Sequence, residues 1–327
     1  METDVTFPFS RGIARLFGLV LALSGTALAQ YPDKPIRHVV PFAPGGSPTL
    51  AGRLVGDGIA EKLEQPVVLD HRPGGNTIIG TEAVAKSPPD GYTLLFASSS
   101  LVTTPLLMPA PFDPVKDFAP VAAVVSGELL LTVHPSVPVN DVKSFIALAK
   151  ASPGKLNHGS LGVGSVSHLA SEQFNILTGI KVANIPYKGS GPVITDLVGG
   201  QLQLAFLTPA TALQYVTSGR VKALAVSGHQ RFAELPNVPT FAESGVPDFD
   251  ARFWFGVVAP AGTPRPIVSR LAGEIAAIVA DPRFKDAMAK VGLDIDYQAP
   301  DAFAALIRND VVKYRKIIDT AGIKIEN

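Results

Sequence analysis

Short apolar runs alternate with amphipathic stretches along the chain from residue 36 onward. Apolar runs at 36–42, 67–69 and 93–97 predict strands, because they are short and lie between turn-forming residues. Apolar residues at helical spacing over 50–63 and 77–86 predict helices between those strands. Strand, loop, helix and strand in this order are typical of βαβ units. The pattern therefore predicts an α/β fold on a mainly parallel sheet.

A second series of the same kind follows. Its predicted strands are 129–133, 156–160, 182–186, 202–206 and 223–226, and its predicted helices are 142–151, 166–177 and 192–198. The last third of the chain then returns to a strand at 253–259 and to helices at 266–280, 281–291 and 301–321. We therefore expect two lobes joined by two crossings, near 125–130 and 222–230.

This organisation predicts the domain boundaries. The first lobe would contain residues 30–127, the second lobe residues 128–224, and residues 225–327 would return to the first lobe and add the C-terminal helices.

The N-terminus has the pattern of a secretory signal peptide. Arg11 and Arg15 precede the apolar run 16–23, and the small-x-small sequence Ala27-Leu28-Ala29 stands before Gln30. The alternative is a membrane anchor, but the apolar run is too short to span a bilayer comfortably. We expect export and cleavage after Ala29.

Composition excludes several classes of function. The 28 basic residues balance the 28 acidic ones, so no broad surface charge favours nucleic acid or an anionic membrane. The absence of cysteine excludes disulfides, thiolate metal sites and cysteine nucleophiles. The six histidines form no HExxH or similar pair, so no metal site is expected, and no cofactor is implied.

The stretch VVPFAPGGSPTL, residues 39–50, places a Pro/Gly turn between a predicted strand and a predicted helix. It lacks the Lys of a P-loop and the GxGxxG spacing of a dinucleotide site. Glycine backbone amides and a helix N-terminus can still hold an anion, and a carboxylate suits them as well as a phosphate. An ordinary βα turn is the alternative reading. The candidate binding residues here are Phe42, Ala43, Gly45, Gly46, Ser47 and Thr49.

Three further Gly/Ser-rich loops stand where a predicted strand ends and a helix begins, at 72–77, 160–165 and 187–191. In open α/β sheets this edge is where ligands bind. Two lobes that face each other across these edges would form a cleft for a small anion. The candidate residues in the second lobe are Gly162, Gly164, Ser165, Tyr187, Lys188, Gly189 and Ser190, with Ser190 as a predicted helix cap.

Ser165 and His168 raise the alternative of a secreted serine hydrolase. The nucleophile elbow GxSxG is absent, and a spacing of three residues on a helix does not provide proton-transfer geometry. We expect instead that Ser165 caps the helix and that His168 packs or forms a bond in its first turn. Trp254, between Phe253 and Phe255, is expected in the core rather than on a ligand wall.

Several segments together carry a resemblance to a known family. They are YPDKPIRHVVPFAPGGS, RPGGNTIIGTEAVAKSPPDGYTLL, DPVKDFAPV, HPSVPV, GSVSHLASEQF, IPYKGSGPVITDLVGGQLQL, LPNVPTFAESG and FGVVAPAGTP. In this order, from Tyr31 to the C-terminus, the chain resembles the Bug family of periplasmic solute receptors, the substrate-binding proteins of tripartite tricarboxylate transporters.

The resemblance implies a two-lobed periplasmic-binding-protein fold, a Venus flytrap of type II-like architecture with the ligand cleft between the lobes. It implies a periplasmic, monomeric receptor that captures a small organic carboxylate for a membrane permease, and not an enzyme. An alternative with the same fold is a receptor that presents its ligand to a periplasmic sensor kinase. The family's binding loops correspond to 42–49, 162–168, which includes His168, and 187–190.

The chain departs from the family at two positions. Pro48-Thr49 follows the double glycine where the family often has Thr-Asp, and Leu207, followed by Thr208, stands where the family often has Asp. Both changes remove a carboxylate from the expected cleft, and Pro48 also removes an amide donor. We therefore expect a ligand with an apolar body and no ammonium group.

Overall fold

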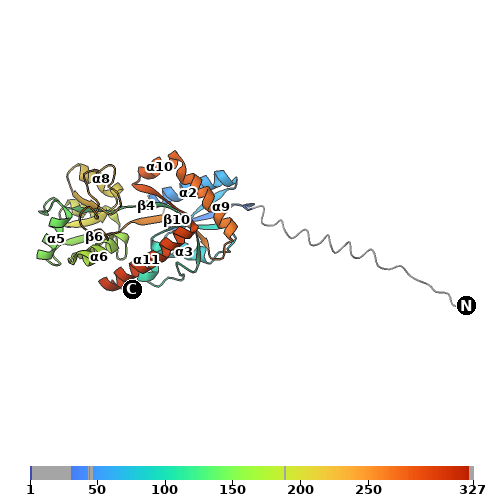
Figure 1. Ribbon diagram of the computed structural model, residues 1–327, viewed down its shortest axis with the longest axis horizontal. Coiled ribbons are helices and arrows are strands. Elements are labelled where there is room, and N and C mark those ends of the chain that lie inside the picture. The colour runs from blue at the N-terminus through green and yellow to red at the C-terminus, as the bar shows by residue number, and fades with distance from the viewer. Residues whose placement is uncertain (2–30, 43, 45–46, 188, 324–327) are drawn as a thin grey trace.

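Two separate β-sheets, one in each lobe, organise the chain (Figure 1). The computed structural model describes residues 1, 31–42, 44, 47–187 and 189–323. The predicted signal peptide, apart from its first residue, lies outside the described residues, as do the candidate residues Ala43, Gly45, Gly46 and Lys188.

The first sheet has six strands in the order β11-β4-β10-β3-β1-β2. Their bounds are β1 (Ile36–Val40), β2 (Val67–His71), β3 (Thr93–Ser98), β4 (Phe118–Gly127), β10 (Phe253–Pro260) and β11 (Leu293–Gln298). Strand β1 runs parallel to β2 and β3, whereas β10 is antiparallel to both of its neighbours and β11 is antiparallel to β4.

The second sheet has five strands in the order β7-β6-β8-β5-β9. Their bounds are β5 (Leu130–Val133), β6 (Asn157–Ser160), β7 (Ala183–Pro186), β8 (Leu204–Leu207) and β9 (Lys222–Val226). Strand β6 is parallel to β7 and β8, and β5 is antiparallel to β8 and β9.

The prediction of a mainly parallel sheet was therefore wrong, because both sheets are mixed. A parallel neighbour requires a crossover connection, usually a helix. Strands β5 and β10 instead enter their sheets directly after the chain has crossed from the other lobe, so each is free to run antiparallel to its neighbours.

Helices cover both faces of each sheet, and each face has its own hydrophobic core. In the first lobe, α2 (Ser47–Leu63), α9 (Arg265–Ala280) and α10 (Pro282–Ala289) cover one face, and α3 (Ile78–Ala85), α4 (Ser100–Leu107) and α11 (Pro300–Ala321) cover the other. In the second lobe, α5 (Val142–Ala151) and α6 (Val166–Thr178) cover one face, and α7 (Ser190–Val198) and α8 (Pro209–Thr217) the other.

Four elements were not predicted: α4, α8, β4 and β11. Helix α4 contains Ser100, Val102, Thr103, Thr104 and Pro105, which lower its helix propensity, and its burial against the first sheet stabilises it instead. Helix α8 begins at Pro209, and proline is favoured in the first turn of a helix.

The two linkers between the lobes are hydrogen-bonded to each other. Strand β4 ends at Gly127 and β5 begins at Leu130, and between them Leu129 donates its N–H to Ser227 Oγ (2.8 Å) while its carbonyl accepts from the Ser227 N–H (2.9 Å). The crossings therefore lie side by side, as a hinge between two lobes requires.

The segment after β9 stays with the second lobe. The ring of Phe249 stacks on Phe206 at 5.7 Å between centroids, and Phe241 packs on Phe249 at 3.9 Å. These rings belong to the same core as helices α5 and α6. We therefore propose that the return to the first lobe begins near Arg252 rather than at residue 225; the domain boundaries stay predictions.

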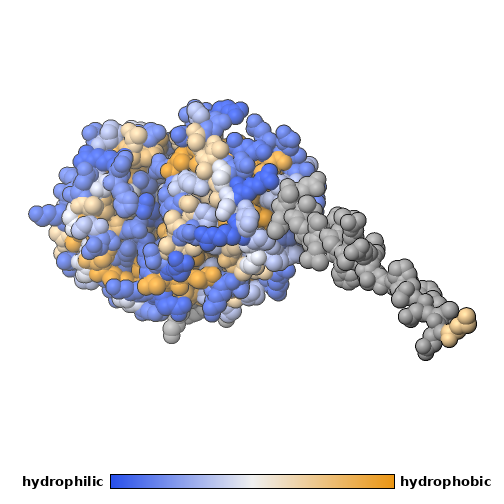
Figure 2. Space-filling model, turned by 45° about the vertical axis from the view of Figure 1, so that its right-hand side comes forward, coloured by the Kyte–Doolittle hydropathy of each residue, from blue (hydrophilic) through white to orange (hydrophobic). Residues whose placement is uncertain are grey.

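The lobes also meet where α6 lies beside α11 (Figure 1). Leu169 of α6 is 1% exposed and belongs to the core of the first lobe, with Trp254 and Tyr314. On the face shown in Figure 2, most surface residues are hydrophilic and hydrophobic ones form small groups among them. No helix among the described residues has the length and apolar character needed to cross a membrane.

Candidate functional site

A cavity of about 330 Å³ lies between the lobes. The first lobe contributes six hydroxyl-bearing residues, Thr77, Ser98, Ser99, Ser100, Thr103 and Thr104, together with Asn76 and the apolar Phe42, Leu107, Met108, Phe253 and Phe255. The second lobe contributes Leu161, Gly162, Val163, Gly164, Ser165 and Val166. Among the described lining residues there is no Asp, Glu, Lys, Arg or His.

The hydroxyl groups of the first-lobe wall are hydrogen-bonded in a chain. Thr77 Oγ1 lies 3.0 Å from Ser100 Oγ, which lies 2.6 Å from Ser98 Oγ. Ser98 Oγ also accepts from the Ser100 N–H at 3.2 Å. A hydroxyl can donate or accept as its partner requires, so such a chain can turn a donor toward an anion.

Thr77 is held in a strained backbone conformation. Its φ is +77° and that of Asn76 is +50°, in the left-handed region that a β-branched residue rarely adopts. Thr104 fixes the turn, because its Oγ1 donates to the Asn76 carbonyl at 3.1 Å. Thr77 occupies the N-cap position of α3, but its side chain makes no capping bond and reaches Ser100 instead. Strain of this kind is concentrated at functional sites.

Three helices begin at the cavity wall. The N-cap residues of α3, α4 and α6 are Thr77, Ser99 and Ser165, and all three line the cavity. The first amide groups of a helix lack intrahelical acceptors and carry partial positive charge. Without a cationic side chain in the described lining, these amides and the hydroxyls are the groups that would hold an anion.

The return strand β10 fixes the start of α4. Trp254 donates its N–H to Ser99 Oγ at 3.0 Å, and its carbonyl accepts from the Ser99 N–H at 3.1 Å. Strand alternation then turns Phe253 and Phe255 toward the cavity, whereas Trp254 is 3% exposed in the core as predicted. Its indole N–H donates to Asp310 Oδ2 at 2.8 Å.

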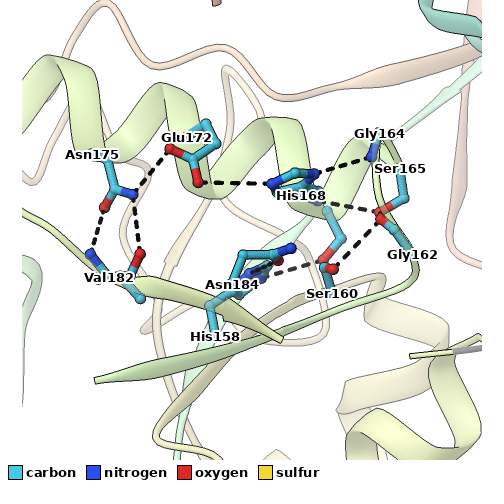
Figure 3. Close-up of polar contacts among 11 residues, drawn as sticks. His158, Ser160, Gly162, Gly164, Ser165, His168, Glu172, Asn175, Val182 and Asn184 are labelled. Atoms are coloured by element: carbon cyan, nitrogen blue, oxygen red, sulfur yellow. Dashed lines mark hydrogen bonds and ion pairs between the residues drawn. The ribbon is translucent and has the colours of Figure 1, made fainter. Parts of the chain in front are cut away.

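The loop between β6 and α6 forms the second-lobe wall, and Figure 3 shows its polar contacts. Ser165 Oγ accepts from the His168 N–H at 3.2 Å and donates to the Gly162 carbonyl at 2.8 Å. His168 Nδ1 accepts from the Gly164 N–H at 3.0 Å. The predicted cap and first-turn bond are confirmed. No bond joins Ser165 Oγ to the imidazole ring in this arrangement, so it offers no Ser–His pair for hydrolysis.

Of the predicted site residues that the structure describes, four line the cavity: Phe42, Gly162, Gly164 and Ser165. His168 is 6% exposed and lies behind the loop. Ser47 begins helix α2, and Thr49 is buried in its first turn. Pro48 lies in that same turn, where an amide would have no partner within the helix.

The other predicted residues lie away from the described lining. Tyr187 donates its hydroxyl to Asp196 at 2.6 Å, and this bond raises the pKa of Tyr187 to about 12. Gly189, not Ser190, is the N-cap of α7, because Ser190 is already the first helical residue. Thr208 is the N-cap of α8, and its hydroxyl lies 3.0 Å from that of Thr211.

Leu207 is fully buried in the second lobe and does not reach the cavity. It is the last residue of β8, pairs with Leu130 and belongs to the core beneath α7 and α8. The strand runs one residue further than predicted, so a position expected at the cleft faces the core instead.

Most of the first-lobe wall was not predicted as a binding site. The signal was the run Ser98-Ser99-Ser100, followed by Thr103 and Thr104, directly after a predicted strand. Ligands of open α/β sheets bind at the carboxyl ends of the strands, so several hydroxyl groups at that end of a parallel strand indicate a binding site. The loop with Asn76 and Thr77 was noted only as Gly-rich.

A second crevice of about 520 Å³ opens beside the linkers and is strongly charged. It is lined by Glu128, Glu234, Asp294 and Asp296, together with Arg231 and Arg252. Burial and the nearby charge of Asp294 raise the pKa of Glu128 to about 7. In the described part of the chain, no group of three or more Asp, Glu or His side chains is arranged to hold a metal ion.

Comparisons with known proteins identify the family of this chain. The profile of the tripartite tricarboxylate transporter family receptors matches residues 51–323. The chain is 35% identical to BugT of Bordetella pertussis, over 95% of this chain and 98% of that one.

Solved structures of similar proteins share the fold. Rpa4515 of R. palustris, solved with adipate, is 32% identical with a TM-score of 0.76, over 90% of this chain and 99% of that one. MatC of Rhodopseudomonas palustris, solved with malate, is 28% identical with a TM-score of 0.73, over 88% of this chain and all of that one. The family and fold are those of periplasmic binding proteins, which bind solutes and are not enzymes. The chain belongs to the tripartite tricarboxylate transporter receptor family of periplasmic solute-binding proteins.

Proposed function

We propose that this receptor binds a small organic carboxylate in the cavity between its lobes. The observation that carries the proposal is the wall of hydroxyls and helix N-termini, without an ionisable side chain among its described residues. Charge-assisted bonds from amides and hydroxyls to a carboxylate are stronger than neutral ones. The proposal is supported by the relatives solved with adipate and malate.

The carboxylate would bind at the Thr77–Ser100–Ser98 chain, where α3 and α4 begin. The first turn of α6 would approach from the opposite lobe. A ligand shifts the equilibrium toward the closed form by the difference between its affinities for the closed and the open form. Simultaneous contacts to both walls require the closed form, so these contacts drive closure.

The rest of the ligand would lie against apolar side chains. The rings of Phe42 and Phe253 each pack on that of Phe255, and Leu107 lies against Gly164 of the opposite lobe. The described lining residues include no carboxylate that could pair with an ammonium group of a ligand. We propose that an organic acid binds more tightly than the corresponding amino acid.

We further propose that the chain is exported, cleaved after Ala29 and acts with a membrane permease of the tripartite type. The predicted role in presenting ligand to a sensor kinase has no support from the comparisons, and neither has the hydrolase. The bonds of Ser165 and His168 also favour a structural role for that pair.

The test is a thermal-shift and calorimetric screen of the mature protein against mono- and dicarboxylates that include adipate, malate and hexanoate. A ligand specific for the folded state stabilises it by about 2.7 kcal/mol at a hundredfold excess over Kd. Ser100→Ala should weaken binding about tenfold because a charge-assisted bond is lost, whereas Ser136→Ala, outside the cavity, should not. If Ser100→Ala bound the acid as tightly as the parent protein does, the carboxylate would not lie at this wall.

The ammonium prediction has its own comparison. Glutamate and glutarate differ only in the ammonium group, as do leucine and 4-methylpentanoate. In each pair we expect the deaminated acid to give the larger shift. Tighter binding of either amino acid would contradict the proposal.

A further inference from the structure

The second-lobe wall of the cavity is a short loop with little regular structure. It runs from the end of β6 at Ser160 to the start of α6 at Val166, and Gly162 (φ +121°) and Gly164 (φ +76°) turn it in the left-handed region. A loop of this composition has many accessible conformations. Ser165 Oγ fixes part of the loop by donating to the Gly162 carbonyl at 2.8 Å, and a bond from outside the loop fixes the Gly164 amide.

His168 supplies the bond that does so. Gly164 is buried, and its N–H points away from the cavity to His168 Nδ1, at 3.0 Å. Because Nδ1 accepts this bond, the imidazole is neutral and carries its proton on Nε2. The Nε2 atom lies 3.7 Å from Glu172 Oε1, one helical turn further along.

Glu172 is held in turn by a bond from the next turn of the helix (Figure 3). Asn175 Nδ2 donates to Glu172 Oε2 at 3.3 Å, and Asn175 Oδ1 accepts from the Val182 N–H at 3.2 Å. A chain of polar groups therefore runs from the residue before β7 to the binding loop. The Glu172 carboxylate lies on the Nε2 side of the His168 ring, at 3.7 Å, and so favours the tautomer that leaves Nδ1 as the acceptor for Gly164.

Gly164 is also the point where this loop touches the opposite lobe. A Cβ at residue 164 would lie 2.2 Å from Leu107 Cδ1, so the Gly164 backbone is already in contact with α4. A small displacement here would alter both the cavity wall and the closure of the lobes.

We propose that His168 is a positioning residue of the binding site, which holds the loop Ser160–Val166 in its ligand-competent form by accepting the Gly164 N–H. The role rests on the proposed function only for its effect on affinity, because the bond joins two residues of the chain itself. His168 does not touch the cavity and acts through Gly164.

Protonation of His168 would abolish this role. A proton on Nδ1 would place two donors against each other, and the Gly164 bond would be lost. Burial lowers the pKa of His168, so the acceptor form prevails at neutral pH. The titratable groups that face the ring are Glu172 on its own helix and His158 on β6, whose pKa burial lowers to about 3. His158 is therefore neutral near neutral pH.

Hydrogen exchange at Gly164 in the ligand-free mature protein tests the proposal directly. His168→Leu removes the acceptor and should speed exchange about tenfold, the loss of one hydrogen bond. His168→Asn places an amide oxygen near the position of Nδ1 and should preserve the protection of the Gly164 amide from exchange. In the parent this protection should show a pH step, a fall below about pH 6.5 as the imidazole takes up a proton, and His168→Asn should lack it. His134→Asn, the same change at a histidine outside the cavity, should alter neither.

Adipate affinity gives the second readout. His168→Leu should bind about tenfold more weakly and His168→Asn within about threefold of the parent, with similar melting temperatures for all three. Unchanged Gly164 exchange in His168→Leu would overturn the inference. If the parent protein binds no acid, the proposed function fails, yet the exchange result still decides the role of His168. If His168→Leu does not fold, the pH step in the parent and its loss in His168→Asn decide it.

Discussion

Thr77 Oγ1 lies 3.0 Å from Ser100 Oγ and so joins the N-termini of two helices, α3 and α4, across the first-lobe wall of the cavity. Thr77 makes this contact from a backbone at φ +77°. The sequence therefore keeps a β-branched residue where glycine would be less strained, and the gain is a hydroxyl at the site.

Replacing Thr77 should separate binding from stability. Thr77→Gly removes the strain and the hydroxyl together, so the free energy of unfolding should change by less than about 1 kcal/mol. Carboxylate affinity should fall about tenfold. Thr77→Ser keeps the hydroxyl and should bind within about threefold of the parent. Equal losses in both variants, measured by calorimetry, would show that the hydroxyl is not the group that matters.

Gly164→Ala should disturb the contact between the lobes. The new methyl group would lie 2.2 Å from Leu107 Cδ1 at a φ of +76°, so the Leu107 side chain must turn away and the cavity wall changes; we expect ligand affinity to fall about threefold to tenfold. Gly179→Ala is the matched control, because its φ is +65° but nothing lies within 4 Å of the added atom. The control should lose about 1 kcal/mol of stability and no affinity. Equal affinity in both variants would exclude a steric role for Gly164.

Glu128→Gln should stabilise the protein at alkaline pH. The pKa of Glu128 is raised from 4.5 to about 7, so its contribution to stability is complete below pH 4.5 and is lost as pH rises through 7. The carboxylate is only half-buried, and after allowance for solvent screening we expect a gain on the order of 1 kcal/mol near pH 8. Urea unfolding near pH 8 and pH 5 measures it.

A gain of the same size at both pH values would contradict the assignment to ionisation of Glu128. Glu61→Gln, on the exposed face of α2, serves as the control for the removal of a surface carboxylate.

His38→Leu should increase stability. His38 is fully buried, neither ring nitrogen has a hydrogen-bond partner among the described residues, and burial lowers its pKa to about 4. Its stability cost therefore appears as pH falls below 6.5 and through 4. Removing an unsatisfied polar group should yield about 1 kcal/mol near neutral pH and more in acid.

His158→Leu provides the contrasting control. His158 is equally buried, but its Nε2 accepts from the Phe206 N–H at 3.4 Å and its Nδ1 lies 3.3 Å from Asn184 Oδ1. Loss of these bonds should cost about 1–3 kcal/mol near neutral pH. Stabilisation in both variants would mean that the hydrogen bonds of His158 contribute nothing.

Much of the fold follows from local pattern. The helix over Val142–Ala151 was predicted at both ends, and in the structure Asp141 and Ser144 form a capping box at its start. Helix α4 was missed because its Ser, Thr and Pro105 disfavour a helix locally and its stability comes from burial. The same limit hid the hydroxyl wall of the cavity.

The sequence by itself determined the two α/β series, the family, the Gly/Ser loops at the strand ends and the cap at Ser165, because each depends on residues close together in the chain. Tertiary structure alone decided that β10 enters the first sheet antiparallel, that Leu207 faces the core, and that Thr77 meets Ser100 while Gly164 meets Leu107. These contacts join residues that are distant in sequence, and local preferences carry no information about which distant surfaces will pack together.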